Sequence, residues 1–227
     1  MRSAVSAALL VVAGGLLAGA ALGADKGAAG KESPLAKAPV VLHVGDSFLG
    51  SGFAQALKPR FQALGAKYVA VVQTSAYTTT LPRQVRLDAL LATHKPVLVL
   101  LTVGANEMRM PRPEDHAPAV KRLSQMAGAS ACIWALPPRW DDKETGILGI
   151  MRRDAGPCRV YDPTSIAPTI PRAGDKMHPS LKGGAMWADA FWSWLMAGRA
   201  PGEMPWDPPR AAPGPSASVA PSASVSP

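Results

Sequence analysis

Short apolar runs alternate with helical patterns along the middle of this 227-residue chain. The run over residues 97–103 is apolar almost throughout, as expected for a strand covered on both faces of a parallel sheet. Strands are predicted at 40–44, 68–72, 97–103, 131–136 and 159–161, and helices at 53–64, 83–93, 113–126, 147–151 and 180–196. Pro59 is expected to kink or restart the first helix. The alternation predicts a three-layer α/β/α sandwich with a parallel sheet of about five strands and right-handed crossovers.

The two ends of the chain are not part of this predicted core. Residues 1–24 begin with a positive charge at Arg2 and continue with an apolar stretch rich in small residues, which is typical of a secretory signal peptide. A membrane anchor is the alternative, although the apolar stretch is short for one. Residues 25–39 are expected to be a flexible lead-in, and residues 199–227, rich in Pro, Ala and Ser, a disordered tail. The core domain is therefore predicted over 40–198, in a secreted or periplasmic protein with no stable membrane insertion after signal removal.

The charge of the chain limits its partners. The formal net charge is +8, and removal of residues 1–24 takes away Arg2 and no acid, which leaves +7. Lys and Arg are scattered, and no basic run alternates with aromatic residues as a nucleic-acid surface requires. We therefore expect no nucleic-acid binding, while attraction to acidic cell-wall or polysaccharide material stays open.

Cys132 and Cys158 are the only cysteines. An even number in an exported protein favours a disulfide, and both lie in segments predicted to be neighbouring strands. Two buried free thiols are the alternative. Two cysteines and scattered histidines give no metal-ligand spacing, so neither a metal nor a cofactor is expected.

Three polar segments follow predicted strands or precede the last predicted helix. They are Gly45-Asp46-Ser47, Gly104-Ala105-Asn106-Glu107 and Asp175-Lys176-Met177-His178. Ligand sites in parallel sheets lie beyond the carboxyl ends of the strands, where these segments are expected to meet. In this order they resemble the three motifs of the SGNH hydrolases, also called the GDSL family of esterases and lipases. The resemblance spans residues 40 to about 197 and implies the flavodoxin-like SGNH fold.

The resemblance implies that Ser47 is a nucleophile and His178 its general base. An unassisted hydroxyl is a poor nucleophile at neutral pH, so an imidazole must take its proton as it attacks. A carboxylate three residues earlier can fold back onto the other ring nitrogen, which fits Asp175 as the group that orients His178. Asp46 is interpreted as a turn-forming group. A helix N-cap for Ser47 and a surface loop pair for Asp175 and His178 are the alternatives.

The resemblance also implies three donors for the oxyanion that forms on attack. They are the Ser47 amide, the Asn106 side chain and an amide in the loop after the second strand. The family has a glycine in that loop, whereas residues 73–78 contain none, and Ser75 is the best match. Glu107 stands where the family has aspartate. Asn106 as a plain turn residue is the alternative.

Arg139 and Trp140 follow the fourth predicted strand at the same edge. Trp140 could stack on a sugar face and Arg139 could pair with an acidic group, so both are predicted to contact substrate. His43, within the first strand, is expected to be a core residue with satisfied hydrogen bonds.

Together these residues predict an exported serine ester hydrolase that acts through an acyl-serine intermediate. The substrate is expected to be a small acyl ester or an acylated carbohydrate, with carbohydrate O-acetyl groups as one candidate. Two alternatives remain: an O-acyltransferase that passes the acyl group from the same serine to a glycan, and a non-catalytic carbohydrate-binding module of the same fold. The acyl chain, the alcohol portion, the oligomeric state and any attachment of the tail to a cell wall stay open.

Overall fold

A computed structural model describes residues 37–197 and 199–208. At its centre is a five-stranded sheet in which every pair of neighbouring strands is parallel. The strands are β1 (Val40–Gly45), β2 (Lys67–Val72), β3 (Leu98–Thr102), β4 (Ala131–Ala135) and β5 (Arg159–Tyr161), in the spatial order β2-β1-β3-β4-β5. The predicted parallel sheet is confirmed, and the ends of each strand lie close to their predicted positions.

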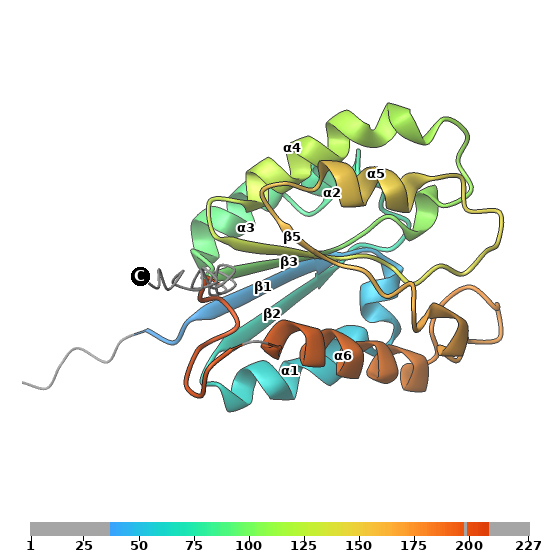
Figure 1. Ribbon diagram of the computed structural model, residues 1–227. Helices are drawn as coiled ribbons and strands as arrows, with labels where there is room; N and C mark the ends of the chain where they lie inside the picture. The colour runs from blue at the N-terminus through green and yellow to red at the C-terminus, as the bar shows by residue number, and fades with distance from the viewer. Residues whose placement is uncertain (1–36, 198, 209–227) are drawn as a thin grey trace, which may run out of the picture. The chain divides into compact units, whose positions relative to one another are not determined.

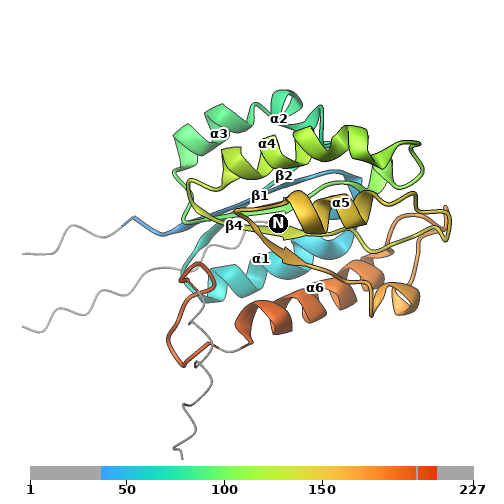
Figure 2. The same cartoon turned by 45° about the horizontal axis from the view of Figure 1, so that its top comes forward.

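Helices cover both faces of this sheet (Figures 1 and 2). One layer consists of α1 (Ala54–Ala63) and α6 (Leu181–Met196), and the other of α2 (Leu81–Gln84), α3 (Leu87–His94), α4 (Ala117–Ala127) and α5 (Ile147–Asp154). Short helical turns are η1 (Leu49–Phe53), η2 (Ala105–Glu107), η3 (Pro113–His116) and η4 (Ala167–Thr169). The predicted three-layer sandwich is therefore confirmed.

Alternating side chains along the strands build a separate apolar core on each face of the sheet. Val41 packs in the cluster with α1 and α6, whereas Leu42 and Val44 pack in the cluster with the opposite helices. Both β1 and β3 are buried along their whole length, as expected for central strands of a sheet that is covered on both sides. This burial fixes where each strand ends and so places the residues that follow it.

The start of α6 packs closely against η1. A Cβ at Gly184 would lie 2.0 Å from the carbonyl oxygen of Ser51, so only glycine permits this approach. Phe53 stacks on Trp187 of α6, with ring centroids 3.8 Å apart. These contacts hold the turn that follows the first motif against the helix that follows the third.

Two predicted helices differ from the structure in their continuity. The helix predicted at 83–93 is divided into α2 and α3, because Arg86 adopts a left-handed conformation with φ of 53°. α1 continues through Pro59 instead of restarting there. Pro59 removes the N–H partner of the Gln55 carbonyl, and both residues are exposed, so water can serve that carbonyl.

The folded part of the chain extends beyond the predicted boundary at residue 198. The guanidinium of Arg199 donates to the carbonyl oxygens of Met204, Pro205 and Asp207 at 2.7 to 3.0 Å. Pro205 is buried, and Trp206 packs against the core on the α1 and α6 side. Residues 199–208 are therefore ordered, because an arginine and a tryptophan anchor what a Pro- and Ala-rich composition predicts as tail.

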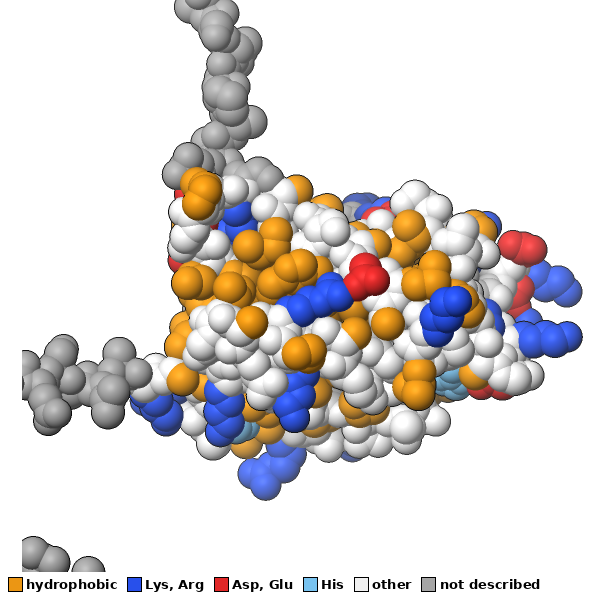
Figure 3. Space-filling view, turned by 90° about the horizontal axis from the view of Figure 1, so that it is seen from below, with side chains coloured by type: hydrophobic (Ala, Val, Ile, Leu, Met, Phe, Trp, Pro, Cys, Tyr) orange, Lys and Arg blue, Asp and Glu red, His pale blue; other side chains and the backbone are white. Residues whose placement is uncertain are grey.

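Figure 3 looks onto the face formed by α1 and α6, where hydrophobic side chains gather toward one end. No helix in the described part of the chain is long and apolar enough to cross a membrane. The predicted signal peptide, most of the lead-in and residues 209–227 lie outside the described residues.

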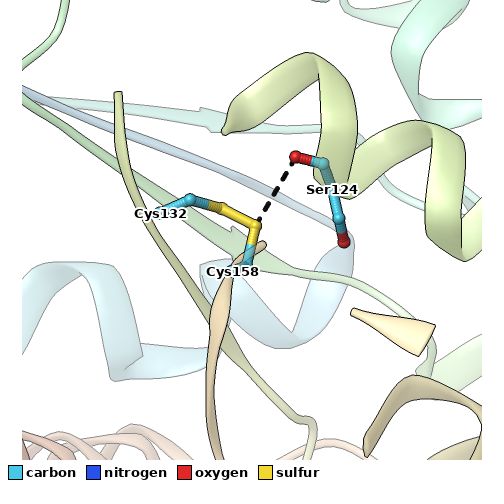
Figure 4. The surroundings of a disulfide bond; sticks show 3 residues. All are labelled: Ser124, Cys132 and Cys158. Carbon is cyan, nitrogen blue, oxygen red and sulfur yellow. Dashed lines mark hydrogen bonds between the residues drawn. A yellow bond between two sulfur atoms is a disulfide. The ribbon is translucent and has the colours of Figure 1, made fainter. Parts of the chain in front are cut away.

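The predicted disulfide between Cys132 and Cys158 is present (Figure 4). Cys132 lies in β4, and Cys158 immediately precedes β5, which pairs with β4 in parallel. The two Cα atoms are 4.5 Å apart, and Sγ of Cys158 lies 3.7 Å from the carbonyl oxygen of Ser124 in α4. The bridge thus joins an edge strand to its neighbour beneath one helical layer.

Candidate active site

The three motifs meet beyond the carboxyl ends of the strands, at the right of Figure 1. Ser47 follows β1, Asn106 lies in η2 just after β3, and the loop with His178 leads into α6. Ser75 lies in the turn between β2 and α2. The parallel direction of the strands brings segments that are far apart in sequence to one edge.

Ser47, His178 and Asp175 form a continuous chain of hydrogen bonds. Oγ of Ser47 lies 2.7 Å from Nε2 of His178, and Nδ1 of His178 lies 2.6 Å from Oδ2 of Asp175. An ionised carboxylate only accepts, so Nδ1 carries the hydrogen and Nε2 is left to accept from the serine hydroxyl. The imidazole is therefore oriented so that Nε2 can take the Ser47 proton.

Asp175 is held as a carboxylate by its own loop. Its second oxygen accepts the backbone N–H groups of Met177 at 2.9 Å and His178 at 3.0 Å. Hydrogen bonding from the His178 ring, together with these amides, lowers the pKa of Asp175 to about 2. The segment is thus a closed turn that presents the imidazole to Ser47, and the surface-pair alternative does not account for it.

The alternative role of Ser47 as a helix cap is not what its side chain does. Oδ1 of Asp46 accepts the N–H of Phe48 at 2.9 Å and so fulfils the turn-forming role, while the Ser47 hydroxyl faces the imidazole. The serine that caps a helix is Ser180, whose Oγ accepts from the N–H of Gly183 at the start of α6.

Asp46 does more than form a turn, which the sequence interpretation missed. It is fully buried, and its Oδ2 accepts the N–H groups of Gly104 at 3.2 Å and Ala105 at 3.3 Å. Burial raises its pKa to about 7, although the backbone donors favour the charged form. Asp46 therefore links the first motif to the second from beneath the site.

The three predicted oxyanion donors lie on the same edge of the sheet. The Ser47 amide opens a helical turn, where the first N–H groups have no intrahelical acceptor. Nδ2 of Asn106 donates to the carbonyl oxygen of Ala76 at 2.8 Å, which uses one of its two hydrogens. Ser75 has φ of 57°, a left-handed conformation that glycine adopts more readily, at the position where the family has glycine. Its N–H donates to no acceptor within the described part of the chain.

Trp140 and Arg139 already have intramolecular partners. The indole N–H of Trp140 donates to the carbonyl oxygen of Ala105 at 3.2 Å, and the Arg109 guanidinium lies 4.6 Å from its ring centroid. Arg139 is exposed, with a guanidinium nitrogen 3.6 Å from a carboxylate oxygen of Asp142. Contact of Arg139 and Trp140 with substrate stays a prediction.

Arg139 and Trp140 border a cavity of about 260 Å³ beside the third motif, which Arg172 and Lys176 also line. Arg172 donates to the carbonyl oxygens of Met177 at 3.0 Å and Arg139 at 2.8 Å. It joins the loop of the third motif to the segment after β4. No sequence pattern marks this arginine, because its acceptors are backbone groups of two separate segments.

His43 is a core residue, as predicted. Its ring nitrogens lie 2.6 Å from the Tyr68 hydroxyl and 2.8 Å from Oγ1 of Thr102, and burial lowers its pKa to about 3. Within residues 37–197 and 199–208, no three His, Cys, Asp or Glu side chains are grouped to hold a metal ion.

No protein-family model and no curated protein sequence matches the chain. Solved structures do share its fold. A lipase/acylhydrolase from Enterococcus faecalis has a TM-score of 0.59 and 15% identity, over 69% of this chain and 95% of its own. An acetyl xylan esterase has a TM-score of 0.57 and 15% identity, over 68% and 98%. A GDSL-like lipase from Bacteroides thetaiotaomicron has a TM-score of 0.50 and 15% identity, over 68% and 86%.

These proteins define the fold class of the chain. It has the α/β fold of the SGNH, or GDSL, esterases and lipases, which confirms at the level of the fold the resemblance that the motifs predict. At these identities the likeness concerns the fold, so the activity has to be argued from the side chains.

Proposed function

We propose that this chain is an exported serine ester hydrolase that acts through an acyl-serine intermediate. The observation that carries the proposal is the hydrogen-bonded chain Ser47–His178–Asp175, with steps of 2.7 and 2.6 Å. Three side chains from two distant segments meet in the geometry that activates a serine hydroxyl. A binding module has no need of that arrangement, so it supports catalysis over the non-catalytic alternative.

The reaction proceeds in two halves. Oγ of Ser47 attacks the acyl carbon while Nε2 of His178 takes its proton, and the carbonyl oxygen becomes an oxyanion facing the proposed donors. The tetrahedral intermediate collapses, the bond to the alcohol oxygen breaks, and His178 returns the proton to that oxygen. Water then attacks the acyl-serine with His178 as base, which releases the acid and restores the Ser47 hydroxyl.

Asp175 acts through the imidazole in both halves. It keeps the proton on Nδ1 and stabilises the imidazolium that forms when His178 accepts the serine proton. Its low pKa, about 2, means that it stays ionised across the pH range in which an imidazole can act as base.

The acyl ester of a carbohydrate is the substrate class that we propose within this reaction. One protein of the same fold is an acetyl xylan esterase. The net charge of +7 that remains after removal of residues 1–24 favours acidic polysaccharide surroundings. Trp140 and Arg139 border a cavity beside the third motif, where an aromatic face and a cation suit a sugar and an acidic group. Export is supported by the pattern of residues 1–24 and by the disulfide, since structural disulfides are typical of oxidising compartments.

A serine-reactive probe tests the proposal directly. The mature chain is incubated with a fluorophosphonate and, separately, with a short-chain aryl ester. We expect turnover and a probe adduct on Ser47, both lost in Ser47→Ala, and both retained in Ser193→Ala, which removes an exposed hydroxyl on α6. A parent protein that neither turns over the ester nor carries an adduct on Ser47 would refute it. Products analysed with a sugar acceptor present separate hydrolysis from acyl transfer.

A further inference from the structure

Two neighbouring side chains of η2 bind one loop, the segment between β2 and α2. Nδ2 of Asn106 donates to the carbonyl oxygen of Ala76 at 2.8 Å. Oε1 of Glu107 accepts the backbone N–H of Thr78. Two hydrogen bonds therefore hold the backbone of this loop, one at the carbonyl of Ala76 and one at the N–H of Thr78.

The loop held by Asn106 and Glu107 contains Ser75, one of five residues other than glycine with a positive φ in the described part of the chain. Ser75 precedes Ala76 directly, and its φ of 57° is uncommon for a residue with a side chain. Such a conformation persists only when surrounding contacts impose it. The hydrogen bonds that Asn106 and Glu107 make to Ala76 and Thr78, one and three residues after Ser75, are contacts of that kind.

The contact between Glu107 and Thr78 lies in the interior of the protein. Glu107 is fully buried, and Thr78 is 1% exposed. Its other oxygen, Oε2, has no hydrogen-bond partner within the described residues. Burial raises the pKa of the carboxyl, and the Thr78 N–H opposes that rise. Burial of a carboxyl group with one unsatisfied oxygen is unfavourable. The hydrogen bond between Oε1 of Glu107 and the Thr78 N–H offsets part of this cost, which indicates that the contact has a role.

We propose that Glu107 is a positioning residue for the oxyanion site: by accepting from Thr78 N–H, it holds the Ser75 amide in the direction from which it donates to the oxyanion. The inference rests on the proposed function, since it assigns Glu107 a part in the same reaction. Glu107 itself does not touch substrate. Its contribution belongs to the transition state, because the donor it aims is needed only when negative charge develops.

Two substitutions of similar size separate the accepting oxygen from the charge. Glu107→Gln keeps an oxygen for Thr78 N–H and removes the charge, whereas Glu107→Met fills the same space and accepts nothing. We expect Glu107→Gln to keep kcat within about threefold of the parent and Glu107→Met to lower it about tenfold or more, with KM within about twofold in both. Asp154→Asn, which alters a buried acid on α5 away from the site, is the control for lost stability.

Hydrogen exchange and a double mutant complete the test. Amides of residues 73–78 are expected to exchange faster in Glu107→Met than in Glu107→Gln, while the rest of the sheet is unchanged. If Asn106 and Glu107 hold the same loop, Glu107→Met should lower kcat by a smaller factor in the Asn106→Ala background than in the parent. Equal kcat for the Gln and Met variants, or unchanged exchange at 73–78, would overturn the inference. Exchange is measured without a substrate, so it decides the grip even if the parent hydrolyses no ester, an outcome that would instead refute the proposed function.

Discussion

Removal of the Cys132–Cys158 bridge should destabilise the fold without touching the chemistry. The bonded residues are 26 apart in sequence, and closing a loop of that length lowers the entropy of the unfolded chain by the equivalent of about 3.5 kcal/mol at 25 °C. A domain of this size loses about 2–4 °C in Tm for each kcal/mol. The double variant Cys132→Ala/Cys158→Ala should therefore melt about 10 °C below the parent.

Thermal unfolding followed by circular dichroism measures this shift. Each single variant also breaks the bridge, so the two single variants and the double variant should lie close together in Tm. Turnover at 25 °C should stay within about twofold, because the bridge joins β4 to the residue before β5, whereas the motifs lie beyond the carboxyl ends of the strands. A Tm shift below about 3 °C would refute the loop-entropy argument. Lost turnover in a folded double variant would show that bridge and site are coupled.

Three further outcomes follow from the structure. Asn106→Ala should lower kcat by about 10²–10³-fold through loss of an oxyanion donor, measured with an aryl ester; an unchanged kcat would exclude that role. Burial raises the pKa of Asp46 from 3.8 to about 7. Between about pH 4 and about pH 7 the native state therefore keeps a proton on Asp46 that the unfolded chain has already released. Stability should therefore fall as pH rises from about 4 to about 7, with Asp46 contributing on the order of 4 kcal/mol, and urea unfolding at several pH values should show a steeper fall in the parent than in Asp46→Asn, which keeps buried Glu107 with its raised pKa. A chain ending at residue 198 should melt about 5 °C below one ending at 208, since it loses buried Pro205 and the packing of Trp206; equal Tm values would show that this segment adds no stability.

The central strands β1 and β3 could be predicted closely because burial on both faces leaves a direct trace in sequence. β1 and β3 are continuous apolar runs, and their neighbours are equally rich in β-branched or bulky residues. The break between α2 and α3 left no such trace, since it depends on Arg86 adopting a positive φ. The order of residues 199–208 was also hidden, because Arg199 binds carbonyl groups that carry no side-chain identity.

In the candidate site, too, some contacts could be predicted from sequence and others depend on backbone groups that sequence does not mark. Asp175 and His178 could be paired from the sequence, because a short spacing decides how a carboxylate meets an imidazole. The pairing of Ser47 with His178, 131 residues away, was implied by the family resemblance. The long-range partners of Asp46 and Glu107 could not be predicted, because they are backbone amides that lie 58 and 29 residues away. Sequence spacing therefore predicts contacts within a turn, whereas contacts between turns come from the folded sheet or from resemblance to a known family.

The two buried acids suggest why these strand-end segments work together. Asp46 of the first motif binds amides of Gly104 and Ala105, and the next two residues, Asn106 and Glu107, bind the loop that contains Ser75. Buried hydrogen bonds thus connect the turn that contains Ser47 to η2, and η2 to the loop that contains Ser75. A displacement at any link would be transmitted to the others, since interiors are packed too densely to absorb it locally. On this argument the serine at 75, with its positive φ, and the buried carboxylate at 107 act together, because the hydrogen bond from Thr78 to Glu107 holds the loop in which Ser75 lies.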